Sequence, residues 1–195
     1  MTAQLPSEDE ARAAFYGLIA RLFYAPPDQG VLGQILNTRA FEESVAPIAV
    51  AWRAMVDACR TAFPVVLENE HTELFVGTGR AEVTPYLTHY ATSYATENLL
   101  VELREHLRRW GIARRESASE PEDHIAGICE AMRFAIAMQH CPLDEQKAFF
   151  DRFLDKSAVA FCSAVNASAK AVFYRHVAGF TLRFLEVERE GFEMG

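Results

Sequence analysis

The chain has 195 residues, of which 50% are hydrophobic and 24% are charged, and its formal net charge is −8. This length allows one sizeable core and excludes two large domains, and the acidic balance argues against nucleic-acid binding by phosphate neutralisation. The same charge favours a basic partner such as an arginine-bearing peptide, although a solvated surface that maintains solubility explains it equally well.

The cysteines and the N-terminus indicate a cellular compartment. Four cysteines form no Cys-x-x-Cys pair, and three of them lie in apolar segments, so we expect buried, reduced thiols. The first residues show neither the basic region nor the apolar region of a signal peptide, and no apolar run reaches membrane-spanning length. We therefore expect a cytoplasmic protein without stable membrane insertion.

Apolar residues recur at helical spacing in the first part of the chain. Ser7 and Glu10 form a capping box at the start of the first such segment, and Pro64 marks a later boundary. The expected helices run from Ser7 to Pro26, from Val31 to Leu36, from Ala49 to Phe63 and from Val65 to Val76.

The periodicity stops between Gly77 and Thr92, in a stretch that we call the aromatic loop. It contains Tyr86 and Tyr90 and is followed by Tyr94. Loops rarely hold this much aromatic surface unless it packs on the body of the protein or meets a ligand. Gly77-Thr78-Gly79 is better explained by a turn after a helix than by phosphate binding.

Helical periodicity resumes after the aromatic loop. Further helices are expected over 99–110, 120–139, 143–161 and 166–188, and no segment shows the alternation of a strand. The sequence therefore predicts an all-α bundle of roughly eight helices in two lobes. The predicted organisation is an N-terminal lobe (1–112, with the aromatic loop 77–92), a hinge linker (113–119) and a C-terminal lobe (120–195).

The helix expected from Glu120 has a polar start. Pro121 suits a first helical turn, and Ser119 with Glu122 forms a capping box. Asp123 and His124 then lie at the beginning of the helix, ahead of an apolar stripe. A well-capped helix start explains this pattern, and a polar recognition site is the alternative interpretation.

Signatures of enzymes are scarce. The sequence contains no P-loop, no nucleophile elbow and no His-Glu-x-x-His motif. Only Glu68 and His71 have the Glu-x-x-His spacing of di-metal bundles, which require two such motifs, so no metal is expected. The alternative function is a small helical metalloprotein or enzyme that uses His89, Asp123 and His124.

Two parts of the sequence together resemble the TorD/DmsD family. Residues 73–79 (ELFVGTG) and 83–90 (VTPYLTHY) resemble its E-x-x-L-F-x-G and P-Y-x-S-x-Y block, and residues 120–126 (EPEDHIA) resemble its E-P-x-D-H-I signature. Thr88 stands where Ser is expected and keeps the hydroxyl, and Thr78 stands where the family often has Pro. The likeness spans most of the chain, but before Glu70 it rests on helical character alone.

The resemblance implies a cytoplasmic chaperone for redox-enzyme maturation that is not itself an enzyme and has no cofactor. Members of this family bind the twin-arginine signal peptide of a molybdenum-cofactor oxidoreductase, and also the apoprotein, and they delay export until the cofactor is inserted. A pure assembly factor of the nitrate-reductase chaperone branch, which shares the fold, is a further alternative. A hinge between lobes would also allow a homodimer by domain swapping.

The resemblance also implies a peptide-binding site. Carboxylates can receive the guanidinium groups of such a peptide, and apolar and aromatic side chains can receive the apolar stretch that follows them. The candidate residues are Leu74, Phe75, Pro85, Tyr86, Tyr90, Glu120, Pro121, Glu122, Asp123 and His124. Leu74 and Phe75 are equally consistent with core packing.

Overall fold

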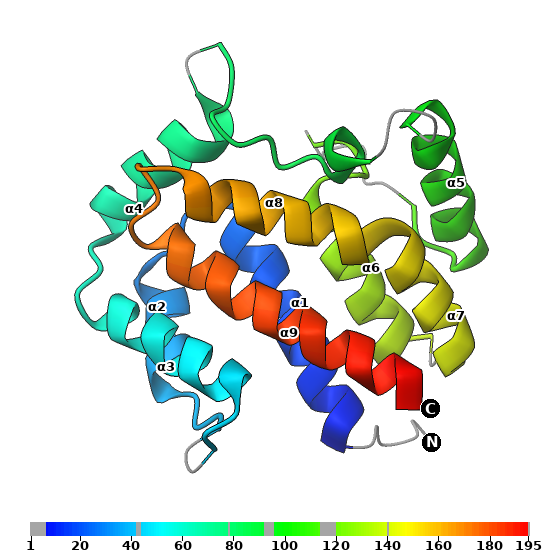
Figure 1. Cartoon of the computed structure of the whole chain (residues 1–195), viewed down its shortest axis with the longest axis horizontal. Coiled ribbons are helices and arrows are strands. Elements are labelled where there is room, and N and C mark those ends of the chain that lie inside the picture. Colours follow the sequence, from blue (N-terminus) through cyan, green and yellow to red (C-terminus); the bar gives the residue numbers. More distant parts are fainter. Residues whose placement is uncertain are drawn as a thin grey trace. The chain divides into compact units, whose positions relative to one another are not determined.

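The computed structural model describes residues 7–41, 44–77, 79–91, 96–113, 120–139 and 141–194. Figure 1 shows that this part of the chain is built from helices, and it contains no β-strand. The predicted all-α fold is confirmed. The α-helices are α1 (Ser7–Tyr24), α2 (Gln29–Asn37), α3 (Pro47–Arg60), α4 (Pro64–His71), α5 (Thr96–Arg109), α6 (Ile125–Ala137), α7 (Leu143–Phe149), α8 (Asp155–Ala167) and α9 (Tyr174–Met194). Short π or 3₁₀ turns are η1 (Thr72–Val76), η2 (Leu87–Tyr90) and η3 (Phe150–Leu154).

The contacts between helices group the chain into two compact units. The first unit combines Met1–Tyr24, Tyr86–Ala158 and Phe192–Gly195, and the second combines Ala25–Pro85 and Val159–Gly191. Each unit therefore joins segments that are distant in sequence, and this division differs from the predicted lobes on either side of residues 113–119. Only Ala113 of that linker is described, and the remainder of the predicted hinge, with Ser119, lies outside the described residues.

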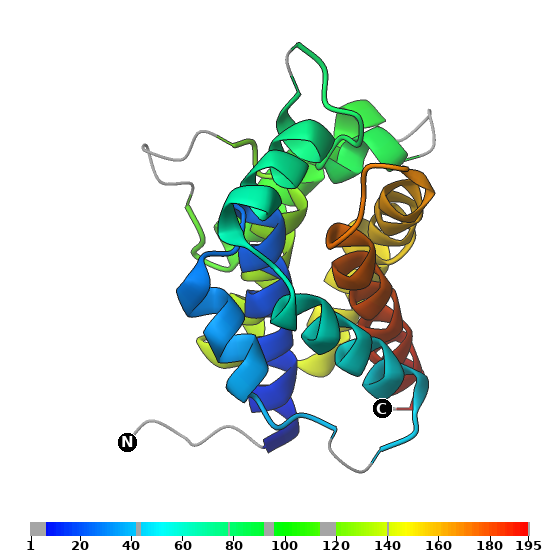
Figure 2. The same ribbon diagram turned by 90° about the vertical axis from the view of Figure 1, so that its left-hand side faces the viewer.

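The first unit is built around the packing of α1 against α6, which run side by side (Figure 2). Ile19, Leu22 and Ile128 are at most 2% exposed, as the apolar stripes of both helices predict. The side chain of Arg133 on α6 packs over Gly17, where a Cβ atom would lie only 2.8 Å from its Cδ. The packing of α1 against α6 thus fixes the N-terminal end of α6, where the candidate functional site lies.

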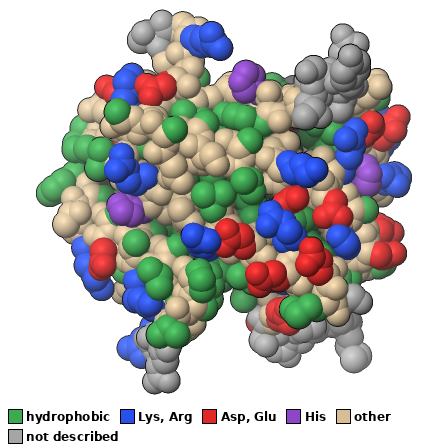
Figure 3. Space-filling view, viewed as in Figure 1, with side chains coloured by type: hydrophobic (Ala, Val, Ile, Leu, Met, Phe, Trp, Pro, Cys, Tyr) green, Lys and Arg blue, Asp and Glu red, His purple; other side chains and the backbone are tan. Residues whose placement is uncertain are grey.

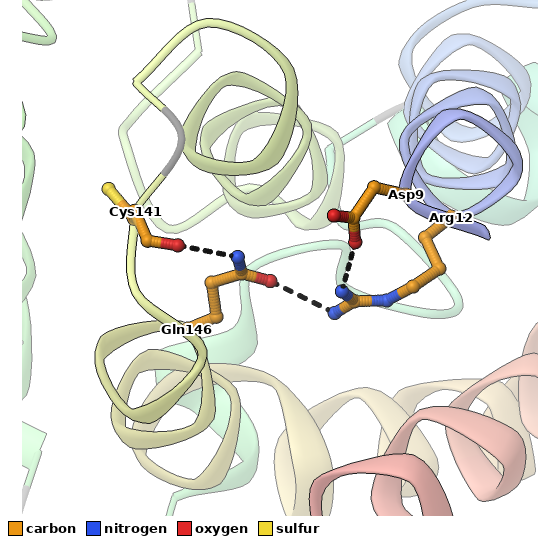
Figure 4. Close-up of polar contacts among 4 residues, drawn as sticks. All are labelled: Asp9, Arg12, Cys141 and Gln146. Atoms are coloured by element: carbon orange, nitrogen blue, oxygen red, sulfur yellow. Dashed lines mark hydrogen bonds and ion pairs between the residues drawn. The ribbon is translucent and has the colours of Figure 1, made fainter. Parts of the chain in front are cut away.

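Arg12 connects α1 to α7 through a chain of hydrogen bonds (Figure 4). Its guanidinium pairs with Asp9 at 2.9 Å and donates to Oε1 of the buried Gln146 at 3.0 Å. The amide of Gln146 in turn donates to the carbonyl oxygen of Cys141 at 2.8 Å. The guanidinium also lies 5.2 Å from the centre of the Phe192 ring, a cation–π distance.

The second unit depends on a buried carboxylate at the start of α9. Glu70 is 9% exposed, and its two oxygens accept the backbone N–H groups of Val172, Phe173 and Tyr174 at 2.8–3.1 Å. These amides would otherwise lack partners at the helix N-terminus, where a negative charge is also favoured by the helix dipole. Glu70 of α4 thus caps a 21-residue helix that begins 104 residues later.

Several predicted helix boundaries are wrong. The helix expected over Val65–Val76 is divided into α4 and the π turn η1, and Gly77 ends it with φ 66°. The segments expected to form helices over 143–161 and 166–188 instead form α7, the π turn η3, α8 and α9. The last of these helices begins only at Tyr174, because Glu70 caps it there. The helix expected from Glu120 begins at Ile125, for the reason given below.

The described surface carries many paired charges. Acidic and basic side chains lie interspersed on the face drawn in Figure 3. Exposed pairs such as Lys147–Asp151 at 2.7 Å and Arg183–Glu186 at 2.7 Å contribute little to stability. No described helix combines the length and the apolar character that a membrane crossing requires.

We predict that Arg12→Ala lowers the free energy of unfolding by about 1–3 kcal/mol, because it leaves the buried Gln146 oxygen without this donor. Urea unfolding followed by circular dichroism measures the change. Arg183→Ala, which removes an exposed arginine from α9, is the matched control and should stay within about 0.5 kcal/mol of the wild type. Equal losses in the two variants would contradict the role of Arg12.

We predict that Glu70→Ala costs about 2–3 kcal/mol in the same measurement, because three amides at the start of α9 lose their acceptor. Glu73→Ala is the control, because the Glu73 side chain is 60% exposed and its ion pair with Lys170 is long, at 3.9 Å. The loss of this carboxylate should cost about 0.5 kcal/mol or less. A Glu70→Ala protein as stable as the control would show that the cap contributes nothing.

Candidate functional site

The aromatic loop lies beside the turn that precedes α6. Tyr86 and His124 form an isolated antiparallel bridge, and the N–H of Leu87 donates to the carbonyl oxygen of Asp123 at 2.9 Å. The hydroxyl of Thr88 donates to the Asp123 carboxylate. These bonds bring together the two segments that carry the predicted motifs, within the first unit.

The pairing also explains why α6 starts later than predicted. The Asp123 carbonyl is used by the aromatic loop, and His124 has an extended backbone (φ −58°, ψ 134°) as the N-cap residue. Its Nδ1 accepts the N–H of Ala126 at 3.1 Å, so the histidine takes the capping role predicted for Ser119. Pro121 therefore precedes the helix and is not its first residue.

Asp123 and His124 are buried, each 5% exposed, and not displayed at a polar edge. The His124 ring lies edge-on to Tyr24 and Tyr86, with centroids 6.2 and 5.7 Å apart. With Nδ1 accepting a backbone amide and the Asp123 carboxylate accepting from Thr88, both side chains hold the loop and the helix start in place. His124 also lines the hollow described below.

Tyr86 reaches across to the carboxylate of Glu120. Its hydroxyl donates to Oε2 of Glu120 at 2.7 Å, and the bond to this anion raises the pKa of Tyr86 to about 12. The phenol is therefore a fixed donor at neutral pH. The half-buried Glu120 carboxylate has further lone pairs with which to accept donors from a ligand.

A hollow of about 380 Å³ opens at the start of α6. Its apolar walls come from α1, the end of α5 and α6, and include Ala20, Tyr24, Leu107, Ile112, Pro121 and Ala126. Its polar lining consists of Arg21, Glu120, Glu122, His124 and Glu130. Carboxylates thus outnumber cationic side chains in an otherwise apolar hollow, which suits a ligand with a cationic group and an apolar body.

Glu122 already binds a guanidinium from its own chain. Nε and Nη2 of Arg104 on α5 donate to Oε1 and Oε2 of Glu122 at 3.2 and 3.1 Å. This two-pronged geometry is the one that carboxylates use to recognise arginine. The bond to Glu122 raises the pKa of Arg104, so the guanidinium keeps its charge at neutral pH.

The predicted site residues Leu74, Phe75 and Pro85 are not part of the lining of the hollow. They belong to the second unit and are buried there. Phe75 packs edge-on to Tyr174 with centroids 5.0 Å apart, which is the core packing considered as the alternative. Tyr90 remains in the first unit, half-buried in η2, with its ring 5.0 Å from that of His89.

Sequence reasoning missed the wall that α1 contributes. Ala20, Arg21 and Tyr24 line the hollow from the last turn of α1, and Leu107 lines it from α5. Ala20 and Tyr24 are one turn apart on the helix, but no motif marks them. Their place follows only from the packing of α1 against α6.

The described residues contain no group of three or more His, Cys, Asp or Glu side chains that could hold a metal ion. His89 of the enzyme alternative is exposed and lies edge-on to Tyr90, whereas Asp123 and His124 are engaged in structural hydrogen bonds. The geometry therefore favours a binding site.

Comparisons with known proteins agree with the helical fold. The chain is similar to the crystal structure of a candidate redox enzyme maturation protein from Archaeoglobus fulgidus, with a TM-score of 0.53 and 18% sequence identity. The similarity covers 93% of this chain and 97% of that one. A comparison with curated proteins found no match.

The likeness to that structure supports the all-α fold, and the class of protein follows from a family model. The sequence model of the nitrate reductase delta subunit family matches residues 41–163, more than half of the chain. The chain belongs to this family, which is TorD-like, and it is a chaperone of redox enzyme maturation. The predicted resemblance is confirmed at this level.

We predict that His124→Ala lowers the free energy of unfolding by about 1–2 kcal/mol, because α6 loses its N-cap. His124→Asn should lose less, since asparagine is a good N-cap residue and retains an acceptor. Urea unfolding compares the two variants. If alanine were tolerated as well as asparagine, the capping bond from Ala126 would have no energetic role.

Proposed function

We propose that this chaperone acts in the cytoplasm and binds the twin-arginine signal peptide of a molybdenum-cofactor oxidoreductase in the hollow at the start of α6. Binding holds back export of the apoprotein until cofactor insertion is complete. The observation that carries the proposal is the combination of apolar walls with the carboxylates of Glu120, Glu122 and Glu130 in one hollow.

The chemistry of such a peptide matches this lining. Two adjacent arginines offer planar guanidinium groups, which bind carboxylates through paired hydrogen bonds, and the apolar stretch after them can bury surface against Tyr24, Leu107 and Ile112. Removal of apolar area from water contributes about 25 cal/mol per Å². Arginine contacts would then select the peptide, and the apolar contacts would supply much of the affinity.

The family name supports a proposal for the client. A nitrate reductase is a molybdenum enzyme, and the family carries its name, so we propose a catalytic subunit of this enzyme class as the client. In this proposal the chain performs no reaction: Asp123 and His124 position the loop and the helix, and the carboxylates bind. The apoprotein beyond the signal peptide is a second contact of the same partner.

We predict that wild-type protein binds a twin-arginine leader peptide and that Glu120→Gln weakens binding about tenfold, because a charge-assisted hydrogen bond becomes a neutral one. A leader with both arginines replaced by lysine should also bind more weakly, since lysine cannot form the two-pronged contact. Isothermal titration calorimetry measures each affinity.

Glu186→Gln is the matched control, because it removes one exposed carboxylate from α9 that does not line the hollow. It should bind the leader as the wild type does at physiological salt. Equal affinity for the arginine and lysine leaders, or equal effects of the two Glu→Gln variants, would contradict the proposed site.

A further inference from the structure

The internal ion pair between Arg104 and Glu122 shows how the hollow receives arginine. We infer that the Arg104 guanidinium occupies the position taken by one guanidinium of a bound arginine peptide, and that binding exchanges one for the other. The inference rests on the proposed function and deepens it, because it assigns a particular carboxylate to a ligand arginine and makes Arg104 a determinant of affinity.

The geometry of Glu122 supports the assignment. The carboxylate is only 16% exposed, lines the hollow, and has both oxygens engaged by separate nitrogens of one guanidinium, at 3.2 and 3.1 Å. It is already oriented and partly desolvated for this type of ligand. A carboxylate that is preorganised in this way loses less freedom when it binds a second arginine than a mobile surface carboxylate would.

The partner is the mobile side of the pair. Arg104 is 48% exposed on α5, and its long side chain can turn into water, where its charge is well solvated. Because the Arg104 end of the pair is half exposed, its release into water requires little free energy when another guanidinium takes its place on Glu122. An incoming peptide held by the apolar walls can therefore displace Arg104 and leave no carboxylate unpaired in the hollow.

The hollow has a second internal ion pair, because Glu130 of its lining pairs with Arg133 on the same helix at 2.8 Å, so the control has to come from a pair outside the lining. Arg152 of η3 pairs with Glu102 of α5 at 2.6 Å, and both side chains are 41% exposed. Neither residue lines the hollow. This pair provides a control of the same chemistry and similar exposure.

Calorimetry with the twin-arginine leader tests the inference. Arg104→Gln should bind the leader about two to five times more tightly than wild type, because no internal guanidinium has to be displaced. Arg152→Gln removes the same positive charge from a pair that does not line the hollow. It should change the affinity for the leader only through the long-range effect of that charge, and therefore less than Arg104→Gln does. In a Glu122→Gln background, Arg104→Gln should no longer tighten binding.

A second readout follows Arg104 directly. When arginine amide is titrated into the wild-type protein, the NMR signal of the Arg104 Nε–H group should move toward that of a free arginine side chain. The Arg152 signal should stay in place. Movement of both signals together would indicate general ionic screening and would overturn the assignment.

The two proposals fail in different ways. Displacement of Arg104 by arginine amide without any binding of the leader would overturn the signal-peptide function and retain the assigned guanidinium position. Leader binding with an unmoved Arg104 signal, and with Arg104→Gln no tighter than Arg152→Gln, would overturn the position and retain the function.

Discussion

The pairing of the aromatic loop with the turn before α6 is the constraint on which the site depends. The Leu87 N–H and the Thr88 hydroxyl both donate to Asp123, and Tyr86 donates to Glu120. Together these three bonds keep residues 120–123 out of α6 and leave His124 as its N-cap residue. The hollow exists because α6 starts at Ile125, so that Glu120 and Glu122 lie on an ordered turn and do not continue the helix.

The carboxylates of the hollow have internal partners, which explains how an acidic site can be stable without a ligand. Glu120 is held by a phenol and Glu122 by a guanidinium from α5. Burying a charge without a partner would be costly, whereas exchanging one donor for another is not. In the proposed function, a peptide arginine would therefore bind by substitution of donors at carboxylates that are already oriented.

Much of the fold could be predicted because local physics determines it. The stripes that include Ile19 and Ile128 have helical spacing, and both residues are buried in the packed pair α1 and α6. The starts of α6 and α9 could not be predicted, because the groups that fix them come from distant residues. Glu70 is 104 residues from Tyr174, and no local pattern reports such a cap.

The residues of the candidate site also divide into those that the local sequence predicts and those that tertiary packing determines. Glu120 matches the family signature and Glu122 is a further carboxylate in the same segment, and both line the hollow, whereas Leu74 and Phe75 of the other motif are core residues of the second unit. An apolar helical stripe is equally compatible with a core and with a binding wall, so the sequence left that choice open. The wall residue Tyr24 became visible only through tertiary packing.

The central claim is that arginines of a client peptide bind at the start of α6. Photocrosslinking tests it most directly, with a twin-arginine leader that carries benzoylphenylalanine next to the arginines and mass spectrometry to locate the attachment. The account predicts attachment to residues that line the hollow, such as Tyr24, Pro121 or Gly127. Attachment confined to the second unit, for example at the exposed Phe63 or Val172, would contradict it.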